Sequence, residues 1–196
     1  MCGIAGLIHK GKSSNVGGEM TAMLQALKHR GPDSTGYAVY GEASEGDYIM
    51  RLKLAEAEDM DRGRGIHAVL DERIAAVADI LKEHGAKVKV EDRVRPYAMR
   101  YVISHDGDTG EMAEHIEEIE GVEILSLGNG LELIKDLGDA AVVAEAYGLN
   151  DFTGTHGIGH TRMATESDVD IKSAHPYWAF PYNDVSVVHN GQITNY

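Results

Sequence analysis

The chain begins Met1-Cys2-Gly3-Ile4-Ala5-Gly6, and Cys2 is its one cysteine. Aminopeptidases remove an initiator methionine when the next residue is small, which would leave Cys2 with a thiol and a free α-amino group on the same carbon. Because an α-amino group has a pKa of about 7.7–8.0, it can take the thiol proton as a general base. The stretch therefore predicts an N-terminal nucleophile followed by an apolar strand over 3–8. The alternative is that Cys2 is a tolerated small residue beside the start methionine.

The next segment predicts a strand, a helix and a second strand. Apolar residues recur at helical spacing over 19–29, at Met20, Met23, Leu24 and Leu27. Gly31-Pro32 ends this helix, because proline cannot continue one. The β-forming residues of 37–40 then predict the second strand.

Glycines and histidines interrupt the apolar runs near the end of the chain. The sequence there predicts strands over 157–165 and 185–189, and the second of these leads into Asn190-Gly191. Asn-Gly by itself indicates a tight turn. The functional alternative is that this turn directs a side-chain amide and a backbone N–H at one point, as an oxyanion hole does.

Four segments, in this order, resemble the class II, or N-terminal-nucleophile, glutamine amidotransferases. They are Cys2-Gly3-Ile4-Ala5-Gly6, His29-Arg30-Gly31-Pro32-Asp33-Ser34, Gly159-His160-Thr161-Arg162-Met163-Ala164-Thr165 and His189-Asn190-Gly191-Gln192-Ile193-Thr194-Asn195. The resemblance implies an α+β fold, the αββα sandwich of the N-terminal-nucleophile hydrolases, with a partial amidotransferase domain over 1–40 and 153–196. The stretch 164–178 most resembles the stand-alone amidotransferase subunits of glutamate-synthase-like and N-methylglutamate-synthase-like systems.

The resemblance also implies a role for each motif residue. Cys2 would attack the side-chain amide of glutamine, and the Asn190 side chain with the Gly191 N–H would hold the oxyanion. Arg162 would bind the α-carboxylate of glutamine, and Thr165 and His175 would line the same pocket. The structural alternatives are a surface arginine at 162 and hydrogen-bonded structural histidines at His160 and His175.

The middle of the chain, 41–152, falls outside the resemblance. Its periodicity predicts strands at 48–54, 87–90, 99–103 and 122–127, and helices at 69–84, 109–119 and 140–147. The order β-α-β-β-α-β is that of a ferredoxin-like unit. We therefore expect an inserted α+β module, which either binds an effector or a partner subunit or acts as a passive spacer.

The two amidotransferase segments total only 84 residues. That length is short for a sandwich of two sheets flanked by helices, so we expect an incomplete catalytic domain at the C-terminal end. In the family an acidic residue binds the α-amino group of glutamine, and no residue here is assigned to that role.

Composition narrows the functional classes. The chain has 196 residues, is 43% hydrophobic and carries a formal charge of −14, which disfavours nucleic acid and anionic membrane surfaces as partners. It contains no signal peptide pattern and no apolar run of spanning length. A single reactive thiol suits a reducing compartment, so we expect a cytoplasmic protein.

No motif for a flavin, an iron–sulfur cluster or ATP is present, so the expected acceptor of ammonia is a synthase subunit on another chain, which would hold any flavin or iron–sulfur cluster. No metal site is expected, since His156 and His160 lie on a predicted strand and Asp106-Gly107-Asp108 lacks the rest of a calcium loop. The alternative function is a non-catalytic regulatory or assembly module with a degenerate or truncated amidotransferase fold and an effector-binding insert.

Overall fold

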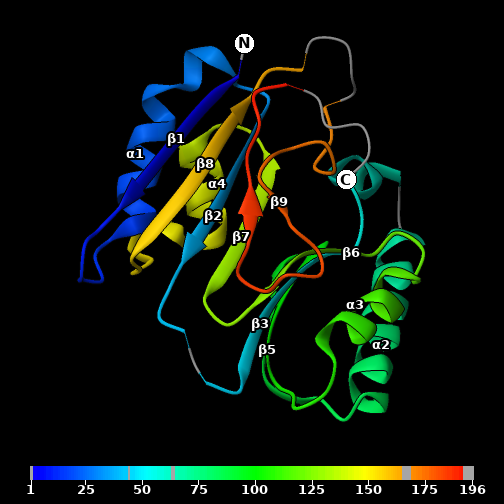
Figure 1. Cartoon of the computed structure of the whole chain (residues 1–196). Helices are drawn as coiled ribbons and strands as arrows, with labels where there is room; N and C mark the ends of the chain where they lie inside the picture. Colours follow the sequence, from blue (N-terminus) through cyan, green and yellow to red (C-terminus); the bar gives the residue numbers. More distant parts are fainter. Residues whose placement is uncertain (1, 44, 63–64, 165–168, 192–196) are drawn as a thin grey trace.

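The computed structural model of the chain contains two antiparallel four-stranded sheets (Figure 1). It describes residues 2–43, 45–62, 65–164 and 169–191. The first sheet joins strands that lie far apart in the sequence. Its order is β1 (Gly3–Ile8), β8 (His156–Arg162), β2 (Ser34–Tyr40) and β7 (Leu131–Leu137).

Two helices cover one face of the first sheet: α1 (Val16–Ala26) and α4 (Ala140–Tyr147) (Figure 1). Their apolar residues pack against alternate residues of the strands, including Tyr37 and Val39 of β2, because successive side chains of a strand point to opposite faces. The Asn15 side chain caps α1 by accepting from the backbone N–H of Gly18, and Asp139 caps α4 in the same way. These caps satisfy N–H groups that a helix start otherwise leaves without partners.

The opposite face of the first sheet is covered by a short ribbon of β9 (Tyr177–Trp178) and β10 (Ser186–Val187). Ala38 and Leu133 form a small apolar cluster there with Trp178 packed against it. On the β1 side of this face, Ile4 is 44% exposed and Ile8 is 76% exposed.

The second sheet has the order β4-β5-β3-β6, with all neighbours antiparallel. Its strands are β3 (Asp47–Lys53), β4 (Lys87–Arg95), β5 (Ala98–Ser104) and β6 (Glu123–Gly128). Helices α2 (Gly65–Glu83) and α3 (Thr109–Glu117) lie side by side over it (Figure 1). The chain order β3-α2-β4-β5-α3-β6 with this strand order is the ferredoxin-like arrangement expected from the sequence.

The strand pairing departs from the expected division of the chain at residue 152. Both β7 and α4 lie within 41–152, yet β7 pairs with β2 along its whole length and α4 packs on the first sheet. The part of the chain that forms the second sheet thus ends at Gly128, the last residue of β6. The sequence pattern does not predict β7, because its charged residues are buried in ion pairs and hydrogen bonds and give no alternation of apolar and polar residues.

Short 3₁₀ helices connect the larger elements: η1 (Lys28–Arg30), η2 (Ala57–Arg62) and η3 (Leu149–Asp151). Over the described ranges, no helix combines the length and apolarity needed to cross a bilayer. The α+β class is confirmed, and helices packed on antiparallel sheets are compatible with the N-terminal-nucleophile sandwich.

Candidate active site

Three of the four sequence motifs meet at one end of the first sheet. Gly3 of β1 pairs with Thr161 of β8, and Ser34 of β2 pairs with Arg162. Continuing the β1 register by one residue places Cys2 across from Arg162. Residues two apart on a strand share a face, so Arg162 and His160 lie on the face opposite α1 and α4. Cys2, a free thiol that is half-buried, is at the edge of this face.

The motif over 29–34 holds the chain segments of Cys2 and Arg162 in place. The Arg30 side chain donates from Nε to the Cys2 carbonyl oxygen at 3.1 Å. The backbone N–H of Asp33 donates to the Arg162 carbonyl at 3.1 Å, and Asp33 Oδ2 accepts from the Ala164 N–H at 2.7 Å. A Cβ atom at Gly31 would lie 2.5 Å from the carbonyl carbon of Arg162, so only glycine allows this approach.

Arg30 and Asp33 were not assigned roles in the sequence analysis, although both lie within a motif that it singled out. Their contacts with Cys2 and Arg162 span 28 residues or more along the chain. Only the folded sheet brings these partners together, so residue spacing gave no signal of the contacts. The structure therefore adds two residues that position the predicted site residues.

Two buried imidazoles lie on the same face. His160 is 1% exposed and His175 is 3% exposed, and their ring centroids are 4.7 Å apart. His175 Nδ1 donates to the carbonyl oxygen of His189 at 2.6 Å, which leaves its Nε2 as the acceptor in the neutral ring. Neither ring nitrogen of His160 has a hydrogen-bond partner among the described residues.

Burial lowers the pKa of His160 to about 3 and that of His175 to about 4. For His160, the neighbouring His175 and the Arg162 guanidinium act in the same direction. For His175, the hydrogen bond to the His189 carbonyl opposes the decrease in part. Both imidazoles are therefore neutral at neutral pH, beside the positive charge of Arg162, and the site favours an anionic group.

The segment that carries His175 crosses β2 at close range. A Cβ atom at Gly36 would collide with the carbonyl oxygen of His175. Glycine at this position of β2 thus lets the segment lie directly on the sheet. This contact explains how a residue outside the first sheet is fixed against His160.

Asn190 and Gly191 follow β10 and are exposed. The hydrogen bond from His175 to the preceding residue, His189, ties them to the histidines. The expected strand over 185–189 is shorter, limited to Ser186–Val187. Among the predicted site residues, the structure thus brings Cys2 and Arg162 to one end of the sheet and links His175 to the Asn190-Gly191 segment. Thr165 and the rest of the fourth motif, 192–195, lie outside the described residues.

His156 and Asp108, which the sequence analysis considered as weak candidates for metal ligands, have other partners in the structure. The His156 ring stacks on Tyr40 with centroids 4.0 Å apart, and its Nδ1 lies 2.9 Å from Thr155 Oγ1. Asp108 caps α3 by accepting from the N–H groups of Gly110 and Glu111. In the described part of the chain, no three histidine, cysteine or carboxylate side chains form a group that could hold a metal ion.

Comparisons with known proteins agree with the motifs. No family model matches the chain. The whole chain aligns with a putative glutamine amidotransferase of Methanothermobacter thermautotrophicus at 38% identity, over 63% of that protein. It also aligns in full with the glutamine amidotransferase-like protein GlxB of Rhizobium meliloti at 31% identity, over 60% of that protein.

A shorter part of the chain, 45%, is 33% identical to 15% of a glutamine–fructose-6-phosphate aminotransferase from Idiomarina loihiensis. The chain spans about 60% of the length of the two relatives that it matches in full. The narrower likeness to the subunits of glutamate-synthase-like systems stays a prediction. The chain is homologous to glutamine amidotransferases along its whole length, and the class II resemblance that the four motifs indicated is confirmed.

Proposed function

We propose that the protein hydrolyses glutamine to glutamate and ammonia, with Cys2 as the nucleophile. The observation that supports this proposal is the strand register, which pairs Gly3 with Thr161 and, continued by one residue, brings the backbones of Cys2 and Arg162 opposite each other. A thiol and a buried guanidinium at the same end of a sheet suit attack on a substrate that is held by its carboxylate. The homology to glutamine amidotransferases supports glutamine as that substrate.

In the first half of the reaction, removal of Met1 exposes the α-amino group of Cys2. This group takes the thiol proton, and the sulfur attacks the side-chain amide carbon of glutamine. The side-chain amide of Asn190 and the N–H of Gly191 stabilise the oxyanion. One donor of this kind lowers the barrier by about 3–4 kcal/mol. The amide nitrogen receives the proton and leaves as ammonia, and the glutamyl group remains as a thioester.

In the second half, water attacks the thioester carbon, glutamate leaves and the Cys2 thiol is restored. Arg162 binds the α-carboxylate of glutamine, and Thr165 and His175 line the pocket. The reaction needs no cofactor. The ammonia passes to a partner synthase subunit, which would carry any flavin or iron–sulfur cluster, and a reactive thiol suits the cytoplasm.

The test uses diazo-oxo-norleucine, an electrophilic glutamine analogue, and intact-mass spectrometry. We expect protein from its native host to lack Met1 and to gain one adduct, at Cys2. The Cys2→Ser variant should lose glutamine hydrolysis while a partner synthase still uses free ammonium. Retention of Met1 in the active protein would remove the proposed base and refute the mechanism.

The alternative, a regulatory or assembly module without catalysis, makes the opposite prediction. Such a module would hydrolyse no glutamine with Cys2 intact, and the analogue would leave its mass unchanged. The same experiment therefore separates the two functions.

A further inference from the structure

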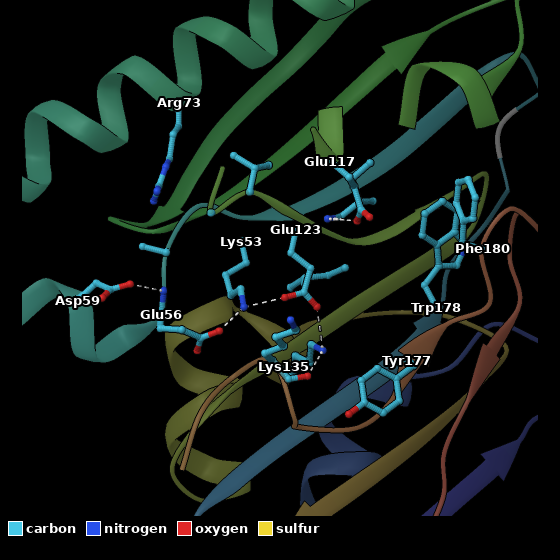
Figure 2. Close-up of a pocket in the computed structure, with 16 residues that line it drawn as sticks. Lys53, Glu56, Asp59, Arg73, Glu117, Glu123, Lys135, Tyr177, Trp178 and Phe180 are labelled. Carbon is cyan, nitrogen blue, oxygen red and sulfur yellow. Dashed lines mark hydrogen bonds and ion pairs between the residues drawn. The ribbon is translucent and has the colours of Figure 1, made fainter. Parts of the chain in front are cut away.

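A cavity of about 560 Å³ is lined by residues from both sheets (Figure 2). The second sheet and its helices supply most of the lining, and β7 and the segment from Lys172 to Phe180, which includes β9, close it. Its volume falls in the range of small-molecule sites, which is about 300–1,000 Å³. None of the described residues that are assigned to the glutaminase site lines it.

The floor of the cavity is a row of paired charges. Lys53 forms ion pairs with Glu56 and with Glu123, the latter at 2.6 Å. Glu123 also pairs with Lys135 Nζ at 3.4 Å, and Figure 2 shows the row running from Glu56 to Lys135. The lysines are 5% and 2% exposed. Because these charges neutralise one another, the floor itself favours neither an anion nor a cation.

Two groups of opposite charge reach the cavity from the helices, Arg73 from α2 and Glu117 from α3 (Figure 2). Arg73 donates from Nη1 to the Leu54 carbonyl at 2.5 Å, and a guanidinium has five N–H donors. Glu117 Oε1 accepts from the Ile124 N–H at 2.9 Å, and a carboxylate accepts through two oxygens. Both groups are anchored by one backbone contact and retain capacity for a ligand.

The third part of the lining is aromatic. Trp178 and Phe180 pack edge to face with centroids 5.4 Å apart, and the indole N–H is occupied by the Tyr182 carbonyl at 2.8 Å. These rings offer apolar surface to an occupant near Glu117 (Figure 2).

We propose that this cavity binds an α-amino acid, with its carboxylate on Arg73, its ammonium group on Glu117 and its side chain against Trp178 and Phe180. A ligand that carries one positive and one negative charge matches the lining, because the lining has as many cationic as anionic side chains. A ligand with one charge would leave Arg73 or Glu117 without a counter-charge in a partly desolvated site.

The cavity is linked to the histidines through the segment that leads into β9. Lys135 Nζ donates to the Lys172 carbonyl at 3.1 Å and lies 4.7 Å from the centroid of the Tyr177 ring. The Tyr177 ring in turn contacts His175, with centroids 4.7 Å apart. A ligand that changes the packing of Tyr177 therefore changes the position of His175. This consequence for glutaminase activity rests on the proposed function, whereas the binding site does not.

The binding test uses the fluorescence of Trp178, the one tryptophan of the 196-residue chain. Each of the common α-amino acids is titrated alone, followed by the decarboxylated amine and the deaminated acid of the tightest binder. We expect saturable quenching or enhancement by at least one amino acid and affinities about ten- to a hundredfold lower for its two single-charge analogues. Absence of a saturable change with every amino acid, or equal affinity for an analogue, would refute the proposal.

Two variants remove one charge each. In Glu117→Gln the amide oxygen still accepts from the Ile124 N–H, whereas Arg73→Gln, whose side chain is two atoms shorter, also loses the hydrogen bond from Nη1 to the Leu54 carbonyl. Both should lower the affinity about ten- to a hundredfold. The matched controls are Glu114→Gln, exposed on the same helix, and Arg93→Gln, which lies outside the cavity. An equal loss in variants and controls would show that the charges do not contact the ligand.

The link to the histidines is measured separately by the imidazole NMR signals of His175 and by glutaminase rate. We expect the ligand to shift the His175 signals and to change the rate of glutamine hydrolysis. Shifted signals in a protein without glutaminase activity would refute the proposed function but not the site. Binding without any change at His175 would refute the link.

Discussion

Two clusters of buried polar side chains differ in how their charges are satisfied. In the first, which we call the ion-pair cluster, Glu132 of β7 pairs with Arg51 at 2.5 Å and with Arg100 at 2.9 Å. In the second, the histidine cluster, His160 and His175 lie beside Arg162, and neither ring nitrogen of His160 has a hydrogen-bond partner among the described residues.

The difference indicates separate tasks. Burial alone would raise the pKa of Glu132, but Arg51 and Arg100 hold it below its ordinary value, so all three groups are charged and join the two sheets. Burial lowers the pKa of both histidines, and both are neutral at neutral pH beside the Arg162 guanidinium. Paired charges serve the fold, whereas polar groups left without partners indicate a place for a substrate.

The largest expected effect is on the ion-pair cluster. Glu132→Gln removes the carboxylate between two guanidinium groups. It leaves the buried Arg51 without its carboxylate partner, while the half-buried Arg100 keeps its pair with Asp92 at 3.6 Å. We expect the free energy of unfolding to fall by about 3–5 kcal/mol, measured by urea denaturation. Asp71→Asn, which breaks the exposed pair with Arg93 at 2.8 Å, is the control and should cost less than about 1 kcal/mol. Equal losses would show that burial does not distinguish the two pairs.

The next effect concerns the segment tied to the histidine cluster. Asn190→Ala removes one proposed oxyanion donor, so kcat for glutamine hydrolysis should fall by about 10²–10³. Asn190 is exposed, and the free energy of unfolding should change by less than about 0.5 kcal/mol. A normal kcat would remove Asn190 from the mechanism.

The pH dependence of stability tests the neutral histidines. The unfolded-state pKa of histidine is about 6.5, and the folded values are about 3 for His160 and about 4 for His175. Between these values only the unfolded chain binds the proton. The contribution of the two neutral histidines to the free energy of unfolding is thus complete above pH 6.5. It is lost as the pH falls toward the pKa values of the folded state.

When the pH is lowered from 6.5 to 5, each histidine should lower the free energy of unfolding of the wild type by about 1–2 kcal/mol. Urea denaturation at both pH values measures this loss. His160→Gln, which does not titrate, should show a smaller loss than the wild type over the same interval. An equal loss of unfolding free energy in the variant and the wild type would contradict the lowered pKa of His160.

The smallest effect is expected at Arg162. Arg162→Lys keeps the charge but replaces a bidentate fork by a single ammonium group. We expect the KM for glutamine to rise about tenfold with a smaller change in kcat, measured by steady-state glutaminase kinetics. A decrease in kcat with an unchanged KM would place Arg162 at the reacting atoms instead of at the substrate carboxylate.

Helix α4 and strand β7 show where sequence patterns predict secondary structure and where they do not. Helix α4 begins and ends where its apolar pattern predicted, at Ala140 and Tyr147. Strand β7 was missed, because Glu132, Lys135 and Asp136 are buried at 2–4% exposure and a strand buried on both faces shows no alternation. Its charges are tolerated only because partners from the second sheet reach them.

The sequence by itself determined the motifs, the α+β class and the ferredoxin-like order of the middle region, because these depend on local periodicity and on residue types in fixed order. Only the tertiary structure decided that β7 closes the first sheet, that Arg30 and Asp33 hold Cys2 and Arg162, and that His160 lies against His175. Each of these contacts joins residues far apart in the sequence, and pairing at that distance depends on how whole elements pack. Local patterns carry no information about such packing.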